Sequence, residues 1–342
     1  MEKLATGSQQ KASNGVQDYY LTDEVRQLIS TLPREKDFDG TYLYQYQEGF
    51  WYRPTYIVCI LSAQRHFQAR DDDIILITYP KSGTTWLKAL TYAIVHRSHY
   101  AFEHSPLLTA NPHELVPFID HPAYYSENHC PRNLEHLPNS THSIFGTHIP
   151  YPSIPRSIMN SNCRIVYMCR NPLDQFISYW HFMVKIAQDR ETEPLSLEEA
   201  LERVSHGIQG FGPSWEHVLG YWRASLENPN KILFLKYEDV IEDTLFYVKK
   251  MAEFLGCPFS SVEENQGVIE EISNLCSFEN MKDLKVNKTG RLVPPGAPKN
   301  SFFFREGKVG DWTNYLTSPM LECLKNLMEE KFSGSGLTFR IT

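Results

Sequence analysis

The chain has 342 residues, of which 42% are hydrophobic, and carries a formal net charge of −8. This acidic balance argues against nucleic acid as the main partner, and no apolar run has the length of a membrane span. The length suits one large domain with a well-buried core. The seven cysteines are scattered without a Cys-x-x-Cys pair, and no secretory h-region is evident. We therefore expect a cytoplasmic protein without a disulfide framework or a metal site.

The amino-terminal part divides into a tail and the start of the domain. Residues 1–17 are polar and predict a disordered tail, so the folded domain is expected to span 18–342. A short amphipathic helix is predicted over 23–29. An alternating strand follows, marked by Tyr42, Tyr44 and Tyr46.

Three later runs have the composition of buried parallel strands. They occupy 73–78, 163–169 and 231–237 and are rich in apolar and β-branched residues. A helix with an apolar stripe is predicted over 87–95, and Asn171-Pro172 is a typical start for another helix after the second strand. This alternation predicts an α/β fold with a parallel sheet flanked by helices on both sides.

The segment 79–86, Tyr-Pro-Lys-Ser-Gly-Thr-Thr-Trp, joins the first of these strands to its helix. Backbone N–H groups of such a turn and the positive end of the helix converge on one point, which favours an anion. Lys81 adds a full charge, and three hydroxyl donors are available from Ser82, Thr84 and Thr85. A Walker A loop has its lysine after the glycine, whereas here the lysine precedes it. The order therefore favours a phosphate ester other than ATP or GTP over an ordinary capped turn.

Two of the other predicted strands also end in polar residues. Arg170 follows the strand at 163–169, at the edge where open α/β sheets bind ligands, and its guanidinium can hold a phosphate in bidentate fashion. Ser178 lies about two helical turns further on and can face the same pocket. Tyr237 ends the strand at 231–237. The structural alternatives are an ion pair between Arg170 and Asp174, and a core or rim role for Tyr237.

Four segments in register resemble the cytosolic sulfotransferases, which use 3′-phosphoadenylyl sulfate (PAPS). They are 80–86 (Pro-Lys-Ser-Gly-Thr-Thr-Trp), 170–178 (Arg-Asn-Pro…Ser), 235–239 (Leu-Lys-Tyr-Glu-Asp) and 305–312 (Arg-Glu-Gly-Lys-Val-Gly-Asp-Trp). The resemblance covers nearly the whole chain from about residue 30. It implies one α/β domain of the P-loop-kinase-like sulfotransferase fold, with a central parallel sheet of about five strands, and a reaction that needs no metal.

The resemblance also implies where PAPS would bind. The 5′-phosphosulfate would lie in the loop, the 3′-phosphate on Arg170 and Ser178, and the adenine near Tyr237. The carboxyl-terminal signature would add Arg305, Glu306 and Gly307. The loop residues concerned are Lys81, Ser82, Gly83, Thr84, Thr85 and Trp86, of which Lys81 would also stabilise charge on the leaving phosphate.

His148, in the segment 145–150 (Phe-Gly-Thr-His-Ile-Pro), is the candidate general base. The segment resembles the Thr-His-Leu/Ile-Pro motif of the family, whose histidine takes the proton of the acceptor hydroxyl. An imidazole with an ordinary pKa of about 6.5 is neutral near pH 7 and suits this task.

Two positions depart from the family pattern. Glu306 stands where a lysine is usual, so its carboxylate either points outward or weakens donor binding, with Lys308 as a partial substitute. Gly146 stands where animal members commonly carry a lysine. Without that lysine, Lys81 would have to supply more of the charge stabilisation. A small residue at 146 is frequent in the plant branch, and the segments 84–90, 111–117 and 328–332 also look like that branch, in a flavonol sulfotransferase-like form.

The acceptor is expected to be a small aromatic or apolar hydroxyl compound, first of all a flavonoid or another phenolic. Hydroxyjasmonates, brassinosteroids and desulfo-glucosinolates remain alternatives within the plant branch. Aromatic residues that would suit a flat acceptor are concentrated at 40–56, although any one of them can equally be core. The further candidates are Phe102, Phe118, Tyr124, Tyr125, Tyr151 and Phe211.

Two rival functions and the oligomeric state also follow from the sequence. The rivals are an Mg²⁺-dependent nucleotide kinase and a catalytically silent nucleotide-binding relative. The dimer motif of the family would fall between Thr313 and Glu322, but Thr313 replaces its lysine and Ser318 its valine. We therefore expect a monomer with a small-molecule partner.

Overall fold

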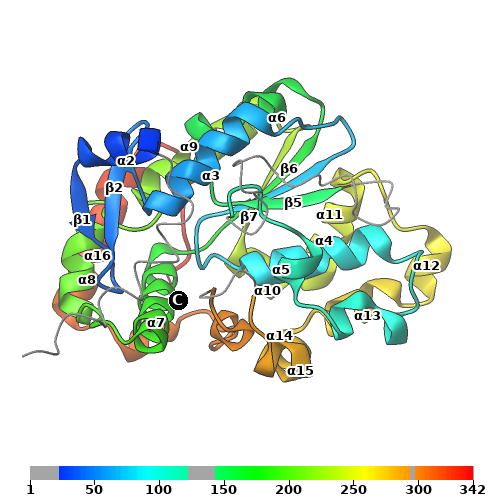
Figure 1. Ribbon diagram of the computed structural model, residues 1–342. Coiled ribbons are helices and arrows are strands. Elements are labelled where there is room, and N and C mark those ends of the chain that lie inside the picture. The colour runs from blue at the N-terminus through cyan, green and yellow to red at the C-terminus, as the bar shows by residue number, and fades with distance from the viewer. Residues whose placement is uncertain (1–22, 122–142, 293–296, 342) are drawn as a thin grey trace, which may run out of the picture.

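The computed structural model describes residues 23–121, 143–292 and 297–341, and the expected tail at 1–17 lies outside these ranges. Its centre is a parallel sheet of four strands in the order β5-β4-β6-β7 (Figure 1). The strands are β4 (Ile74–Thr78), β5 (Ile144–Thr147), β6 (Arg164–Cys169) and β7 (Ile232–Lys236). The three predicted core strands and the α/β class are thereby confirmed.

The sheet falls one strand short of the expected five within the described residues. Beyond β5 a single parallel bridge joins Phe118 to Gly146, held by two backbone hydrogen bonds. Strand β5 itself was not predicted from the sequence. It has only four residues, one of them a glycine, so the apolar run is too short to distinguish from a loop.

Helices cover both faces of the parallel sheet, as the continuous burial of its strands requires. On one face, β4 and β6 pack against α4 (Thr84–His96), α11 (Thr244–Phe254) and α13 (Val268–Leu275). On the other face they pack against α3 (Pro54–His66) and α9 (Ser214–Glu227).

A second, antiparallel sheet adjoins this core. It contains β1 (Arg34–Lys36), β2 (Tyr42–Tyr46) and β3 (Phe50–Tyr52) and follows helix α2 (Asp23–Ser30). The helix predicted over 23–29 and the alternating strand at Tyr42, Tyr44 and Tyr46 are both confirmed.

A third cluster of helices encloses a core of its own beside the sheets. It is formed by α7 (Pro172–Arg190), α8 (Leu197–Ser205) and α16 (Ser318–Phe332), which pack around residues such as Phe176 and Leu324. Asn171 caps α7, as the Asn-Pro pair predicts, because its side chain accepts from the N–H of Asp174. The remaining α-helices are α5 (Pro112–Leu115), α6 (Arg156–Asn160), α10 (Tyr237–Glu242), α12 (Ser261–Asn265), α14 (Phe278–Asp283) and α15 (Lys285–Thr289).

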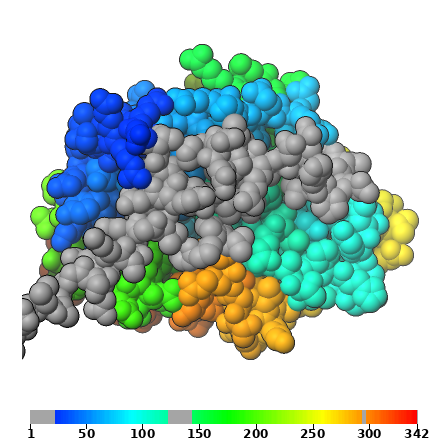
Figure 2. Space-filling model, viewed as in Figure 1, coloured from blue at the N-terminus to red at the C-terminus, as the bar shows by residue number. Residues whose placement is uncertain are grey.

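The register of the parallel sheet decides where chemistry can occur. Ile77 pairs with Thr147, Thr78 with Met168, and Cys169 with Lys236, so the carboxyl ends of all four strands lie at one edge. The segments that follow them therefore emerge side by side. Figure 2 shows blue amino-terminal residues, cyan and green segments and the orange region around α14 on one face of the molecule.

Candidate active site

A cavity of about 2070 Å³ lies at the carboxyl edge of the sheet. Small-molecule sites typically measure roughly 300–1,000 Å³, so this space is large enough for two ligands side by side. Its lining includes the loop after β4, the histidine after β5, the arginine after β6 and the tyrosine after β7. Every site predicted from a strand end therefore meets in one cavity.

The loop between β4 and α4 is held in an unusual backbone conformation. Lys81 has φ 68° and Gly83 has φ 93°. A Cβ atom at Gly83 would lie 2.7 Å from both Met168 and Tyr237, so only glycine fits there. Gln175 of α7 donates to the carbonyl of Pro80 at 2.9 Å and fixes the start of the turn. The loop is therefore preformed, with the amino terminus of α4 facing the cavity.

The Lys81 side chain is enclosed rather than solvated. Its Nζ lies 4.1 Å from the ring centroid of Phe182 and 5.6 Å from that of Phe303. Burial, followed by the charges of Lys185, Arg305 and Arg170, lowers the pKa of Lys81 to about 7. A desolvated cation with like charges nearby binds an incoming anion more strongly than an exposed lysine does.

Arg170 makes the ion pair that the sequence left open as an alternative. One terminal nitrogen donates to the carbonyl of Lys308 at 2.6 Å and lies 3.5 Å from Asp174. The ion pair with Asp174 therefore exists, although Asp174 also accepts from the backbone N–H groups of Gly310 and Trp312. The Arg170 Nε is buried and has no hydrogen-bond partner, so a donor remains for a ligand.

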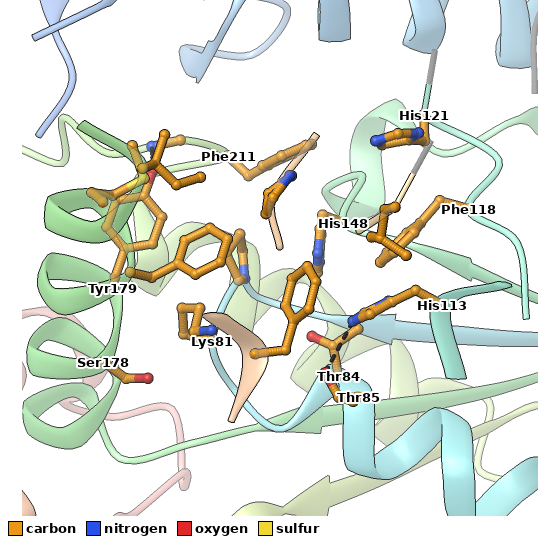
Figure 3. A pocket seen from close by; sticks show the side chains of 18 of the residues that line it. Lys81, Thr84, Thr85, His113, Phe118, His121, His148, Ser178, Tyr179 and Phe211 are labelled. Atoms are coloured by element: carbon orange, nitrogen blue, oxygen red, sulfur yellow. Dashed lines mark hydrogen bonds between the residues drawn. The ribbon is translucent and has the colours of Figure 1, made fainter. Parts of the chain in front are cut away.

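The other predicted donor-site residues lie around Arg170. The Tyr237 ring packs 4.7 Å below the Arg170 guanidinium and contacts Trp86 edge-on at 5.5 Å. Arg305 pairs with Asp311 but keeps a buried, unpartnered Nε of its own. Ser82, Arg170, Ser178 and Tyr237 are all buried, and Figure 3 shows Ser178 on α7, one residue before Tyr179.

Residues 306 and 307 differ in what they contribute. Gly307 has φ 67°, and a Cβ atom there would lie 2.5 Å from the Phe278 ring, so the backbone must approach closely. Glu306 is exposed at the mouth of the cavity. Its charge raises the pKa of Lys185, against the larger lowering by burial.

His148 points into the cavity opposite Lys81 and near Thr84 (Figure 3). Its Nδ1 lies 2.7 Å from the backbone carbonyl of Thr78. A carbonyl only accepts, so Nδ1 carries the proton and Nε2 keeps its lone pair for a substrate. Burial is the main cause that lowers the pKa of His148 to about 3. The expectation of an ordinary pKa near 6.5 is wrong for this histidine, which is neutral throughout the physiological range.

A buried network that sequence reasoning missed holds His148 in place. His217 lies 2.9 Å from the carbonyl of His148, and the Tyr167 hydroxyl lies 3.0 Å from the other His217 nitrogen. Asp120 accepts from the His148 N–H at 3.2 Å, and burial raises the pKa of this carboxyl to about 6. Nothing in the local sequence of these residues distinguishes them from ordinary core positions.

Aromatic rings enclose the space beside His148. Phe118 lies 5.0 Å and Phe211 5.5 Å from the imidazole, measured between ring centroids, and Tyr56 packs against Phe211 at 4.9 Å. Among the aromatic candidates at 40–56, Tyr42, Tyr44, Tyr52 and Tyr56 line the cavity, whereas Phe50 and Trp51 belong to the buried core.

The other predicted acceptor residues divide between core and cavity. Phe102 and Tyr151 pack against the hydrophobic core, and Tyr124 and Tyr125 lie outside the described residues. Within the described ranges, no three histidine, cysteine or carboxylate side chains are grouped so as to hold a metal ion. None of the described helices is long and apolar enough to cross a membrane.

Comparison with known proteins gives a consistent result. Residues 71–336 match the family model of the sulfotransferase domain. The chain is 41% identical to cytosolic sulfotransferase 15 of Arabidopsis thaliana, over 100% of this chain and 94% of that one. It is 44% identical to cytosolic sulfotransferase 14 of the same plant, over 96% and 94% of the two chains.

A solved structure supports the same grouping. It is the crystal structure of an Arabidopsis thaliana protein provisionally assigned as a steroid sulphotransferase, with 38% identity and a TM-score of 0.72. The match covers 94% of this chain and 99% of that one. The resemblance to plant cytosolic sulfotransferases and the predicted fold are thereby confirmed.

Proposed function

Because this chain belongs to the plant cytosolic sulfotransferase family, which transfers a sulfuryl group from PAPS, we propose that it sulfates a small phenolic hydroxyl with His148 as general base. The observation that carries this proposal is the position of His148. Its unprotonated Nε2 faces a cavity that has aromatic rings on one side and, on the other, the loop 79–86 between β4 and α4.

The donor would occupy the half of the cavity bounded by α4, α7 and residues 305–307. Its phosphosulfate would lie on the N–H groups and hydroxyls of Ser82, Thr84 and Thr85 at the start of α4. Its 3′-phosphate would take the free nitrogens of Arg170 and Arg305, together with the Ser178 hydroxyl. Two buried guanidinium nitrogens without partners are costly unless a ligand binds them, which supports this placement.

The adenine would pack against the contacting pair formed by Trp86 and Tyr237. Their rings are 5.5 Å apart and nearly perpendicular, at 72°, and the two residues line the same cavity as the loop 79–86. The cavity-facing surface of such an edge-to-face pair can pack against a flat heterocycle by dispersion.

The transfer itself is an in-line displacement at sulfur. The acceptor oxygen forms a bond to sulfur while the bond from sulfur to the phosphate oxygen of the donor breaks. Nε2 of His148 takes the proton of the acceptor hydroxyl, and the leaving PAP carries the electron pair of the broken bond. Lys81 would stabilise the charge that grows on that phosphate oxygen, which is preorganised electrostatic catalysis.

The choice of a phenolic acceptor depends on Phe118, Phe211 and Tyr56 beside His148. Rings at these separations stack against a flat acceptor and orient its hydroxyl toward the base. A brassinosteroid is the second candidate, because the plant structure with 38% identity carries a provisional steroid assignment. Hydroxyjasmonates and desulfo-glucosinolates share the chemistry and remain in the test panel.

Glu306, the kinase alternative and the oligomeric state complete the proposal. Glu306 lies at the exposed mouth beside Lys185, so we place it away from the bound 3′-phosphate. The kinase alternative is wrong, because the matched family transfers sulfuryl groups. Thr317 and Glu322 alone match the dimer motif, so we propose a monomer, which sedimentation at micromolar concentration tests by its mass.

The acceptor class is tested by incubation with ³⁵S-labelled PAPS and equal concentrations of flavonols, simple phenols, brassinosteroids, hydroxyjasmonate and a desulfo-glucosinolate, with EDTA present. We expect kcat/KM to be highest for a phenolic. A steroid or jasmonate with the highest value would overturn the acceptor assignment and leave the donor site intact. The His148→Ala variant is the blank in every reaction.

A further inference from the structure

A buried lysine lies directly beneath the loop 79–86, called the donor loop below. Lys88 is on α4, four residues after Thr84, and its side chain is 0% exposed. Its Nζ donates to the carbonyl of Val116 at 2.8 Å, lies 3.3 Å from Nδ1 of His113, and sits 3.1 Å from the ring centroid of Phe118. Burying an ionisable side chain away from water costs free energy, so the contacts of Lys88 need an explanation.

Gly146 leaves the space that this amine occupies. A Cβ atom at Gly146 would lie 2.6 Å from Cε of Lys88 and 2.9 Å from its Nζ. Any larger residue at position 146 therefore displaces the lysine. Animal members commonly carry a lysine at the position of Gly146. The missing side chain at Gly146 is what leaves room for the buried Lys88.

His113 connects Lys88 to the donor loop. Its Nε2 lies 3.0 Å from the Thr85 hydroxyl, drawn as the dashed line in Figure 3. The ring stacks on Phe118 at 5.3 Å with an interplanar angle of 16°, and the Asn111 side chain accepts from the His113 N–H. The imidazole is therefore fixed in position between the amine and the hydroxyl.

The direction of the hydrogen bonds that join Lys88, His113 and Thr85 depends on which nitrogen of His113 carries the proton. Burial and the nearby charge of Lys88 lower the pKa of His113 well below its ordinary value, so the ring is neutral. Burial also lowers the pKa of Lys88 well below its ordinary value. When this amine, charged or neutral, donates to His113 Nδ1, the proton of the neutral ring lies on Nε2. Nε2 then donates to Thr85 Oγ1 and occupies its lone pair. The hydroxyl proton of Thr85 consequently remains free to point into the cavity.

We propose that Lys88 and His113 are positioning residues that orient the Thr85 hydroxyl as a donor toward the sulfuryl oxygens of PAPS. The proposal rests on the donor placement given above. It explains why the second threonine of the loop is bonded inward to a histidine, whereas Thr84 bonds to the Thr78 hydroxyl at 2.6 Å. Since a correctly turned hydroxyl holds the sulfuryl group in line with the attacking oxygen, its loss is expected to lower mainly kcat.

A double-mutant cycle tests this coupling. The variants are Lys88→Met, Thr85→Ala and their combination, with kcat, PAP dissociation constant and Tm measured for each. We expect Lys88→Met to lower kcat roughly ten-fold, less than the 10²–10³ lost with a direct donor. In the Thr85→Ala background, Lys88→Met should lower kcat by no more than about two-fold. PAP lacks the sulfuryl group, so its affinity should stay within about three-fold of wild type throughout.

Thr84 provides the matched control. In the Thr84→Ala background, Lys88→Met should still cost about ten-fold, because Thr84 does not share the His113 contact. If Lys88→Met does not fold, His113→Leu carries the same cycle. His113→Gln should retain most of the activity, because its amide can accept from Lys88 and donate to Thr85.

Three results would contradict the proposal in different ways. Equal losses in the wild-type and Thr85→Ala backgrounds would show that Lys88 does not act through Thr85. A His113→Gln variant no better than His113→Leu would show that His113 only fills space. A Thr85→Ala variant with normal kcat would instead remove Thr85 from the donor site, and the fault would then lie in the proposed donor placement.

Discussion

The two halves of the cavity are built in different ways. The donor half is formed by segments that directly follow β4, β6 and β7, together with residues 305–307. The acceptor half collects Tyr42 and Tyr56 from the amino-terminal region, Phe118 before β5, and Phe211 near α9. In the proposed placement, the donor, which is common to the family, contacts the backbone and fixed charges, whereas the acceptor contacts side chains from separate segments. Specificity can therefore change without disturbing the donor loop.

The largest effect is expected where the two halves meet, at His148. The His148→Ala variant should lose turnover by about 10²–10⁴-fold, the usual worth of a general base. PAP affinity should remain within a few-fold of wild type, because the imidazole faces the acceptor. Calorimetric PAP titration beside a turnover assay separates the two quantities. A parallel loss of PAP binding and Tm would show that His148 is structural.

The pH dependence of PAP affinity tests the role of Lys81 in the donor half of the cavity. Its pKa of about 7 lies below the ordinary value of 10.5, so the free enzyme loses this charge as pH rises through 7. A bound phosphate restores the proton, and PAP affinity should therefore weaken by up to about ten-fold per pH unit above 7. The phosphates of PAP are largely ionised there, with a second pKa near 6.

The Lys81→Arg variant is the control for this pH dependence. Arginine keeps its charge over the whole range, so PAP affinity should be flat between about pH 7 and 9. If wild type and Lys81→Arg weaken in parallel, another group titrates, and the assignment of the pH dependence to Lys81 fails.

The acceptor half is tested at Phe211, which lies between Tyr56 and His148. The Phe211→Leu variant should raise the KM of a phenolic acceptor by about 3–10-fold, because aromatic pairs contribute roughly 0.5–1.5 kcal/mol. The KM of PAPS should not change. Phe246→Leu, at an exposed phenylalanine of α11, serves as the control. An altered PAPS KM in Phe211→Leu would mean that the halves are not separable.

The smallest effect is expected at Glu306. Since its carboxylate is exposed at the mouth, Glu306→Lys should tighten PAP binding by less than about three-fold, and high salt should abolish the gain. Titrations at low and high ionic strength measure this. A ten-fold gain that persists in salt would place Glu306 against the bound phosphate.

The same contrast explains what the sequence could predict. Strands β4, β6 and β7 and the loop at 79–86 are continuous in the chain, so composition and motif order locate them. Strand β5 is too short for periodicity. Lys88 sits within a predicted helix, and its burial depends on tertiary contacts with Val116 and Phe118 that the helical pattern does not encode. His113, Asp120 and His217 reach the site through tertiary contacts alone, which no local pattern encodes.

A crystal structure with PAP and an unreacted phenolic acceptor tests the central claim most directly. We predict that the acceptor hydroxyl lies about 2.6–3.2 Å from Nε2 of His148, the distance at which a base can take its proton. Its ring should stack between Phe118 and Phe211, with the 5′-phosphate of PAP on Lys81. An acceptor bound with its hydroxyl away from His148, while PAP occupies the loop as described, would contradict the assignment of His148 as the base.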